Sequence, residues 1–365
     1  MRPRWLSLKP LVPQSWDEVT PEWMTAAIRS RHPDAVVGKV DILMRDDGTN
    51  RRARFGLSYA SGTGPATVFV KAHAPSHRWV HFRNGNLFGE SRLFAGRTPI
   101  PVDHPAVYLA VPDYPRLDFL LVMEDLDARG ADCRDATRPM SVAQVAHAIT
   151  GLAKLHSLYW GMTATSHPAL KWVKPWTPSQ GWQVGLRRRV PVGLERAGER
   201  LPPEIAAMRG GRVVDLWADY VSTLGDGGQT LLHGDAHIGN AYVLPGDEVG
   251  FLDWQVVRRG NWSQDVGYFL VGALTVEDRR AHERELLAIY RDALTLPTGQ
   301  APSVEGVWHR YRQSHAYGLA VWLSTLGTDG WQSRAVCEAL VERYAMAFID
   351  CATADALAKP PQSVN

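Results

Sequence analysis

The hydrophobic pattern of this chain changes its period once, and that change limits the folds open to it. Up to residue 123, apolar and β-branched residues alternate or run in short stretches bounded by turn residues, as in β-strands. From Ser141 onward, apolar residues recur at the spacing of an α-helix, first over 142–158. Strands in one part of a chain and helices in the other indicate an α+β fold, with a β-rich part followed by a mainly helical part.

The N-terminal part is expected to contain five strands and two helices. The first helix should span 15–29, with Thr20 as its cap and Pro21 at its first position. A shorter helix over 87–95 carries Glu90. The expected strands, of which the first three form an antiparallel meander, are 36–43, 54–59, 66–72, 107–112 and 119–123.

Helical periodicity dominates the C-terminal part. The expected helices are 142–158, 214–224, 276–294, 304–326 and 331–357, with short strands and loops over 231–244 and 248–254. A chain of 365 residues exceeds what one average core supports, so two lobes are expected. The predicted division is an N-terminal lobe over 1–123, a hinge over 124–128, a C-terminal lobe over 129–358, and a frayed tail over 359–365.

Composition and charge exclude several classes of protein. The chain is 45% hydrophobic and 21% charged with a formal net charge of +2, which is typical of a globular protein without a nucleic-acid or membrane partner. Its three cysteines lack metal-site spacing, and no apolar run reaches the ~20 residues of a membrane span. No signal peptide is evident, so a cytoplasmic protein with a small-molecule partner is expected.

The strongest motif is H-G-D-A-H-I-G-N over 233–240, followed by G-F-L-D-W-Q over 250–255. Asp235 and Asn240 have the spacing of a phosphotransferase catalytic loop, in which the aspartate accepts the proton of the substrate hydroxyl and the asparagine binds metal. Asp253 ends an apolar strand and supplies a second carboxylate for metal. Phosphoryl transfer needs such groups because it depends on positioning and charge neutralisation. Mg²⁺, with ATP as co-substrate, is the expected cofactor.

This pattern resembles that of the aminoglycoside phosphotransferase and choline kinase-like superfamily. The segment L-A-K-L-H over 152–156 and the tryptophan-rich C-terminal helices are most similar to its ecdysteroid kinase-like branch. The resemblance implies a bilobal, protein-kinase-like fold and an ATP-dependent kinase that acts on a hydroxyl group of a small molecule. The N-terminal lobe over 1–123 would then bind the nucleotide, and the C-terminal lobe over 129–358 would be the catalytic and acceptor-binding lobe. Relatives of this kind phosphorylate aminoglycosides, choline, amino sugars, macrolides or steroid-like alcohols.

The resemblance also implies roles for residues outside the motif. Lys71 ends the strand V-F-V-K, and an ion pair with Glu90 would hold it against the α- and β-phosphates. Asp265 would support the catalytic loop from a following helix, or it could cap that helix. His233 would pack against the loop backbone and orient it.

Two further segments would complete the nucleotide site. Gly48, Thr49 and Asn50 would form the turn over the phosphates, although the G-x-G-x-x-G of protein kinases is absent and a plain hairpin turn is the alternative. The strand over 121–126 resembles the hinge of relatives. Backbone groups near Glu124 and Leu126 would bind adenine there, and Met123 would line its pocket.

The acceptor is expected to be neutral or moderately apolar. The segment 157–202 offers mainly Glu195 and Glu199 against several arginines, which does not suit a polycationic aminoglycoside. Seven tryptophans could stack on an acceptor or simply fill the core. They are Trp160, Trp172, Trp176, Trp182, Trp308, Trp322 and Trp331.

Two alternative functions compete with kinase activity. In a metallohydrolase, His233, Asp235 and His237 would bind a transition metal, but this leaves Asn240 and Lys71 without a role. In a catalytically weak pseudokinase, the chain would bind nucleotide without transferring phosphate. Loss of a catalytic residue would favour that interpretation, whereas every catalytic role has a candidate here.

Overall fold

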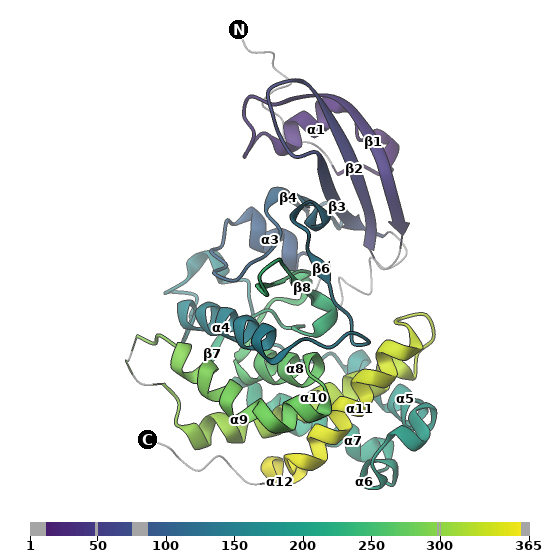
Figure 1. The fold of residues 1–365 in the computed structure, drawn as a ribbon, viewed down its shortest axis with the longest axis vertical. Helices are drawn as coiled ribbons and strands as arrows, with labels where there is room; N and C mark the ends of the chain where they lie inside the picture. Colours follow the sequence, from purple (N-terminus) through teal and green to yellow (C-terminus); the bar gives the residue numbers. More distant parts are fainter. Residues whose placement is uncertain (1–11, 48–49, 75–86, 298, 300, 359–365) are drawn as a thin grey trace. The chain divides into compact units, whose positions relative to one another are not determined.

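The computed structural model describes residues 12–47, 50–74, 87–297, 299 and 301–358, which form two compact units (Figure 1). Unit 1 comprises the described residues of Met1–Pro99, with His104–Ala131 and Asp253–Val256. Unit 2 comprises Ile100–Asp103, Asp132–Leu252 and the described residues of Val257–Asn365. The main division therefore follows Ala131, just beyond the predicted hinge. The predicted tail over 359–365 lies outside the described residues.

Unit 1 is built on a five-stranded antiparallel sheet with the order β1-β2-β3-β5-β4. Its strands are β1 (Val36–Asp47), β2 (Asn50–Ser61), β3 (Thr67–His73), β4 (Val107–Asp113) and β5 (Asp118–Glu124). The predicted meander of the first three strands is confirmed. Strands β1 and β2 extend beyond their apolar segments because polar pairs such as Asp46 and Arg52 continue the ladder.

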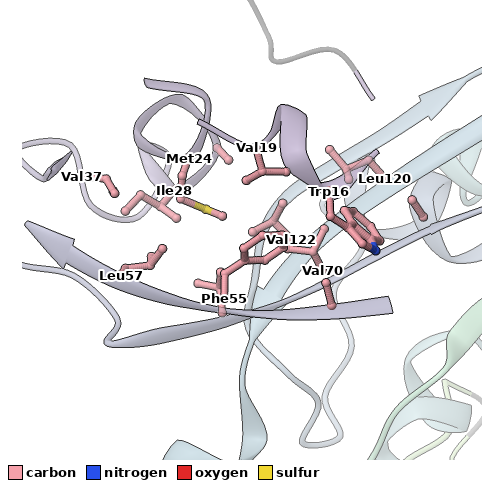
Figure 2. Close-up of a cluster of buried hydrophobic side chains, with 14 of the residues drawn as sticks. Trp16, Val19, Met24, Ile28, Val37, Phe55, Leu57, Val70, Leu120 and Val122 are labelled. Carbon is pink, nitrogen blue, oxygen red and sulfur yellow. The ribbon is translucent and has the colours of Figure 1, made fainter. Parts of the chain in front are cut away.

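One face of this sheet is covered by the N-terminal helix α1 (Pro21–Ile28). Thr20 caps α1 by accepting the Trp23 N–H at 3.2 Å. Figure 2 shows Met24 and Ile28 of α1 among the apolar side chains of the strands, including Phe55. The predicted helix over 15–29 is shorter than expected because a 3-10 turn and Thr20 precede it.

Strand β5 is buried on both faces, as its nearly continuous apolar sequence predicts. Leu120 and Val122 belong to the cluster beneath α1, whereas Leu121 and Met123 belong to a second cluster on the other face. This second cluster adjoins α3 (Gly89–Ala95). Strand β5 therefore contributes side chains to both apolar clusters of unit 1.

Unit 2 is mainly helical. Its helices are α4 (Val142–Leu158), α5 (Gln180–Ala197), α6 (Pro203–Ala206), α7 (Gly210–Ser222), α8 (Ser263–Ala273), α9 (Val276–Ala293), α10 (Val304–Leu326), α11 (Arg334–Asp350) and α12 (Thr353–Ala358). Every residue of α8 is buried, and α10 packs against α5, α7, α8 and α11 (Figure 1). No helix in the described segments is both long and apolar enough to cross a membrane.

Two small antiparallel sheets complete unit 2. One pairs β7 (Gln229–Leu232) with β10 (Arg258–Asn261). The other has the order β6-β8-β9, from Asp132–Cys133, Ala241–Val243 and Val249–Phe251. These short strands bound the loop over 233–240, which we call the catalytic loop. The predicted α+β architecture, with a β-rich unit and a mainly helical one, is confirmed.

Candidate active site

The candidate residues fall into two groups, and each group lies within one unit. The first group, in unit 1, is centred on Lys71 of β3. Its ammonium group lies 2.8 Å from Glu90 Oε2 and 2.8 Å from Asp253 Oδ1. Lys71 and Glu90 are both buried, so water screens their interaction weakly. The ion pair that the resemblance implies is present, and it also includes Asp253.

Local structure explains why these side chains meet. Alternation along β3 places Lys71 on the sheet face opposite to the one that α1 covers. Glu90 is the second residue of α3. At the preceding residue, Gly89, a Cβ atom would lie only 2.2 Å from the carbonyl oxygen of Gln255. Glycine thus allows α3 to approach the segment that carries Asp253.

The pKa values of Lys71 and Glu90 depend on their burial and on the charges of their neighbours. Burial alone would lower the pKa of Lys71, but the negative charges of Asp253 and Glu90 outweigh burial and raise this pKa. Burial raises the pKa of Glu90, although Lys71 opposes the increase. Asp253 also adopts a left-handed φ of 61°, which is unusual for a residue with a side chain. Two carboxylates around one ammonium carry a net negative charge, which suits a nearby divalent cation.

The predicted phosphate turn is described only at its end. Gly48 and Thr49 lie outside the described residues, and Asn50 begins β2. The buried Asn50 side chain donates from Nδ2 to Gln255 Oε1 at 3.2 Å. This bond ties the start of β2 to the segment that carries Asp253. Phosphate binding by the turn stays a prediction.

The first residue of the predicted hinge, Glu124, already bonds to Ala106, which immediately precedes β4. The Glu124 N–H donates to the carbonyl oxygen of Ala106 at 2.8 Å, and the Glu124 carboxylate accepts the Ala106 N–H at 3.1 Å. Leu126 begins a 3-10 turn capped by Asp125, while Met123 packs in the second apolar cluster. Because the Glu124 N–H is used, an adenine contact would have to come from other backbone groups between Glu124 and Leu126.

The second group, in unit 2, occupies the catalytic loop between β7 and β8. The Asp235 side chain is 35% exposed. Asn240 is buried, and its Nδ2 donates to the main-chain oxygen of Asp235 at 2.9 Å and to Asp235 Oδ2 at 3.3 Å. The amide nitrogen of Asn240 therefore serves Asp235, and its amide oxygen is the group suited to a cation.

Asp265 holds the backbone at the start of the catalytic loop. Its buried carboxylate accepts the N–H groups of His233 and Gly234 at 2.7 and 2.9 Å and lies 3.4 Å from His156 Nε2. Burial opposes charge on Asp265, but the hydrogen bond and charge of His156, with the Gly234 N–H, outweigh burial and lower the pKa of Asp265. Helix α8 begins at Ser263, so the Asp265 carboxylate supports the loop instead of capping the helix.

His233 connects two parts of the polypeptide backbone. Its Nδ1 accepts the Asp235 N–H at 3.3 Å, and its Nε2 lies 3.0 Å from the carbonyl oxygen of Leu252. Since Nδ1 accepts a hydrogen bond, the ring proton is assigned to Nε2, which donates to Leu252. His233 thus fixes Asp235 relative to the residue that immediately precedes Asp253 in the chain.

The histidine geometry does not favour the alternative metallohydrolase chemistry. Both ring nitrogens of His233 bond to the backbone, and Nδ1 of His237 accepts the Gly239 N–H at 3.0 Å. Across the described ranges, no group of three or more His, Cys, Asp or Glu side chains is arranged to hold a metal ion. The histidines organise the loop in this structure.

The predicted magnesium ligands have donor atoms of the kind that this ion binds. Mg²⁺ prefers oxygen ligands, and Asn240 offers an amide oxygen while Asp253 offers a carboxylate. Asp253 belongs to unit 1 and Asn240 to unit 2. The role of both residues as magnesium ligands stays a prediction.

Two buried side chains at the loop were not predicted from the sequence. Arg258 and Gln264 both donate to the carbonyl oxygen of Gly234, Gln264 at 3.4 Å. An arginine five residues after Asp253 is the only available signal, and arginines are mostly exposed. Only the tertiary structure shows that Arg258 is buried at the loop.

We expect Asp265→Asn to lower the free energy of unfolding at neutral pH by about 1–3 kcal/mol, because one acceptor oxygen and the negative charge are lost. The pKa of Asp265 is lowered on folding, so its contribution is complete above the ordinary carboxyl pKa and disappears as pH falls through the folded-state pKa. The difference between variant and wild type should therefore shrink in acid. Urea unfolding at neutral and acidic pH measures it, with the exposed Asp219→Asn on α7 as control. An equal difference at both pH values would contradict the role of the charge.

Kinase-like phosphotransferases combine a buried lysine–glutamate pair with a loop that carries a catalytic aspartate and a metal-binding asparagine. Here the buried Lys71–Glu90 pair is present, and the loop carries Asp235 and Asn240 at that spacing. Within that class, the chain belongs to the phosphotransferase enzyme family (APH), whose family model matches residues 57–311. The superfamily that the sequence motif indicates is confirmed, and the ecdysteroid kinase-like branch stays a prediction.

Solved structures share the fold. A candidate aminoglycoside phosphotransferase of Ralstonia eutropha has a TM-score of 0.52 at 16% identity, over 91% of this chain and 96% of that chain. Spectinomycin phosphotransferase, solved with ADP and spectinomycin, has a TM-score of 0.52 at 11% identity, over 92% of this chain and 99% of that chain. At such identities these likenesses establish the fold alone, and they confirm the predicted kinase-like fold. No curated protein is significantly similar in sequence.

Proposed function

We propose that the protein transfers the γ-phosphate of ATP to a hydroxyl group of a small molecule, with Asp235 as the general base. The geometry around Asp235, in a member of a phosphotransferase family, carries this proposal. The carboxylate is partly exposed, Asn240 donates to its Oδ2, and Asp265 holds the adjoining backbone. A carboxylate that is both accessible and fixed can accept a proton from a bound hydroxyl.

In this proposal, unit 1 binds the nucleotide. Lys71 would contact the α- and β-phosphates, and Glu90 would keep its ammonium group in place. The turn over 48–50 would donate backbone N–H groups to the phosphates, and groups between Glu124 and Leu126 would bind adenine. Burial of the Lys71–Glu90 pair supports this role because two buried, paired charges hold a defined geometry.

The chemical step requires one proton acceptor and one leaving group. The oxygen of the acceptor hydroxyl would bond to the γ-phosphorus while Asp235 takes the hydroxyl proton. The bond from the γ-phosphorus to the oxygen bridging the β-phosphate would break, and ADP would leave. Magnesium held by Asn240 and Asp253 would neutralise charge on the phosphate oxygens. Asn240 would also keep Asp235 Oδ2 in place through its amide nitrogen.

We also propose that the acceptor is neutral and moderately apolar. The surroundings of Asp235 within unit 2 are aromatic: burial and then the charge of Asp235 raise the pKa of Tyr268. The His237 ring lies 5.9 Å from the Tyr268 ring and 5.4 Å from the Trp322 ring, between centroids. The buried cation of Arg258 contacts the same loop. A polycationic aminoglycoside would be repelled by Arg258.

The seven tryptophans considered for acceptor binding differ in their exposure to solvent. Trp322 is buried and belongs to the core, and Trp331 is 53% exposed. The remaining five are half-buried, namely Trp160, Trp172, Trp176, Trp182 and Trp308. A half-buried indole can pack and still stack on a ligand. Trp176 is the best candidate for acceptor contact because its ring also contacts Arg258 at the catalytic loop.

The proposal is tested by ADP release from Mg-ATP over a panel of amino sugars, aminoglycosides, macrolides, choline and steroid alcohols. We expect a neutral acceptor to raise release above the acceptor-free background, and polycationic aminoglycosides to leave it unchanged. The same assay is run on Asp235→Asn purified in the same way. Any ADP release that persists in this variant is assigned to contaminating ATPases. Transfer to an aminoglycoside would contradict the proposal of a neutral acceptor but would leave the proposal of phosphate transfer standing. If ATP binds but no alcohol in this or a wider panel raises release, the pseudokinase interpretation replaces the proposal.

A further inference from the structure

Arg258 is a buried cation at the catalytic loop that takes no part in the proposed phosphate-transfer step. It is the first residue of β10 and is 7% exposed. One terminal nitrogen of its guanidinium donates to the carbonyl oxygen of Gly234 and lies 3.1 Å from the Tyr317 hydroxyl. Burying a cation is costly unless the protein compensates, so the placement of Arg258 at this loop requires a physical reason.

The residue that Arg258 contacts directly precedes Asp235. Gly234 has a φ of 87°, which residues with a side chain rarely adopt. Its N–H donates to Asp265 at 2.9 Å, while its carbonyl accepts from Arg258 and, at 3.4 Å, from Gln264. The buried Asp265 carboxylate therefore holds the N–H of Gly234, and the buried Arg258 guanidinium holds its carbonyl oxygen. The Gly234 carbonyl shares a planar peptide with the Asp235 N–H, so rotation of that peptide would move Asp235.

Aromatic rings hold the guanidinium in turn. Its central carbon lies 4.2 Å from the ring centroid of Trp176 and 5.9 Å from that of Tyr317. The backbone near Trp176 is attached to the same strand, because the Arg259 N–H donates to the carbonyl oxygen of Lys174 at 3.0 Å. These cation–π contacts offset part of the desolvation cost. Nε of Arg258 still lacks a hydrogen-bond partner among the described residues, so this position does not satisfy all of its donors.

We propose that Arg258 is a positioning residue for Asp235: it sets the Gly234–Asp235 peptide through the Gly234 carbonyl, and Trp176 keeps its guanidinium in place. The catalytic consequence rests on the proposed phosphate transfer. The next residue of β10 provides a matched comparison. Arg259 is half-buried, and its guanidinium lies 3.4 Å from the carbonyl oxygen of Met162, away from the catalytic loop.

The kinetic test compares Arg258→Ala and Arg258→Lys with Arg259→Ala. Misplacement of a reacting group costs on the order of 100-fold in rate, so we expect a fall of about that size in kcat for Arg258→Ala, with unchanged Mg-ATP affinity. Lysine should restore little of the rate, because an ammonium lacks the planar fork of donors. Guanidinium ion below unfolding concentrations should recover part of kcat in Arg258→Ala only. Wild-type kcat in Arg258→Ala, or an equal loss in Arg259→Ala, would overturn the proposal.

Hydrogen exchange tests the positioning without requiring activity. The backbone N–H groups of Gly234 and Asp235 should exchange faster in Arg258→Ala than in wild type, and Arg259→Ala should match wild type there. If the Gly234 and Asp235 N–H groups exchange as slowly in folded Arg258→Ala or Arg258→Lys as in wild type, the proposal is overturned, whatever the enzyme assay gives. If wild type transfers no phosphate while the exchange difference is found, the proposed function fails and Arg258 remains the residue that holds this peptide.

Discussion

Replacing Asp235 with asparagine is expected to abolish phosphate transfer and to leave nucleotide binding nearly intact. Asparagine keeps the shape of the side chain but cannot take the hydroxyl proton, and a general base contributes about 10²- to 10⁴-fold to a rate. The Nδ2 group of Asn240, 3.3 Å from Asp235 Oδ2, can still donate to the amide oxygen of the variant. ADP release in the presence of the acceptor measures the rate, and titration calorimetry with Mg-ATP measures the affinity.

The matched control is Asp219→Asn, at an exposed aspartate of α7 in the same unit. It makes the same chemical change away from the catalytic loop and should keep the wild-type rate. A full rate in Asp235→Asn would remove Asp235 from the role of base. Loss of nucleotide affinity together with the rate would instead indicate that Asp235 acts mainly in binding.

Lys71→Met is expected to have the largest effect on stability and to weaken Mg-ATP binding. Lys71 is 5% exposed and is the cation between Glu90 and Asp253. Removing one partner of a buried ion pair costs about 3–5 kcal/mol, because the remaining charge stays buried without compensation. The variant also lacks the ammonium proposed to contact the phosphates. Urea unfolding and titration calorimetry measure the two losses separately.

The stability loss in Lys71→Met should depend on pH. Burial already raises the pKa of Glu90, and without Lys71 this pKa should rise further. A carboxyl whose pKa is raised on folding favours the folded state below its unfolded pKa, and this benefit disappears as pH rises through the folded-state pKa. The difference from wild type should therefore be largest at neutral pH and smaller in acid.

Lys39→Met is the control for Lys71→Met. Lys39 forms an ion pair with Asp41, but its side chain is 69% exposed, and exposed pairs contribute little. We expect nearly wild-type stability and Mg-ATP affinity in this control. Equal losses in both variants, or unchanged Mg-ATP affinity in Lys71→Met, would contradict the role proposed for Lys71.

Secondary structure could be predicted wherever local signals agreed. The predicted helix over 304–326 coincides with α10, which Ser303 caps through the Gly306 N–H. Helix α5 was not predicted because three consecutive arginines and Pro191 interrupt its pattern. The hydrophobic pattern did not indicate helix α8, which the resemblance implied only through Asp265, because this helix is buried on every side and lacks an amphipathic period. The helix predicted over 331–357 is divided near Cys351 into α11 and α12.

The candidate site was predictable only in part. Asp235 and Asn240 are five residues apart, so their spacing alone indicates a loop that carries both. The Lys71–Glu90 ion pair was implied by resemblance to relatives. The link from Asn50 to Gln255 was not expected, because it joins side chains 205 residues apart that no local pattern connects.

Residue types, periodicity and short-range spacing are properties of the covalent chain, and they were enough for the α+β class, for the phosphotransferase motif and for most helices and strands. The support of the catalytic loop was decided by packing. Asp265 reaches Gly234 from 31 residues away, and Arg258 from 24 residues away. Both are charged side chains that an isolated segment would leave in water. They are buried at this loop because the fully buried α8 and the pairing of β7 with β10 bring distant backbone groups to them.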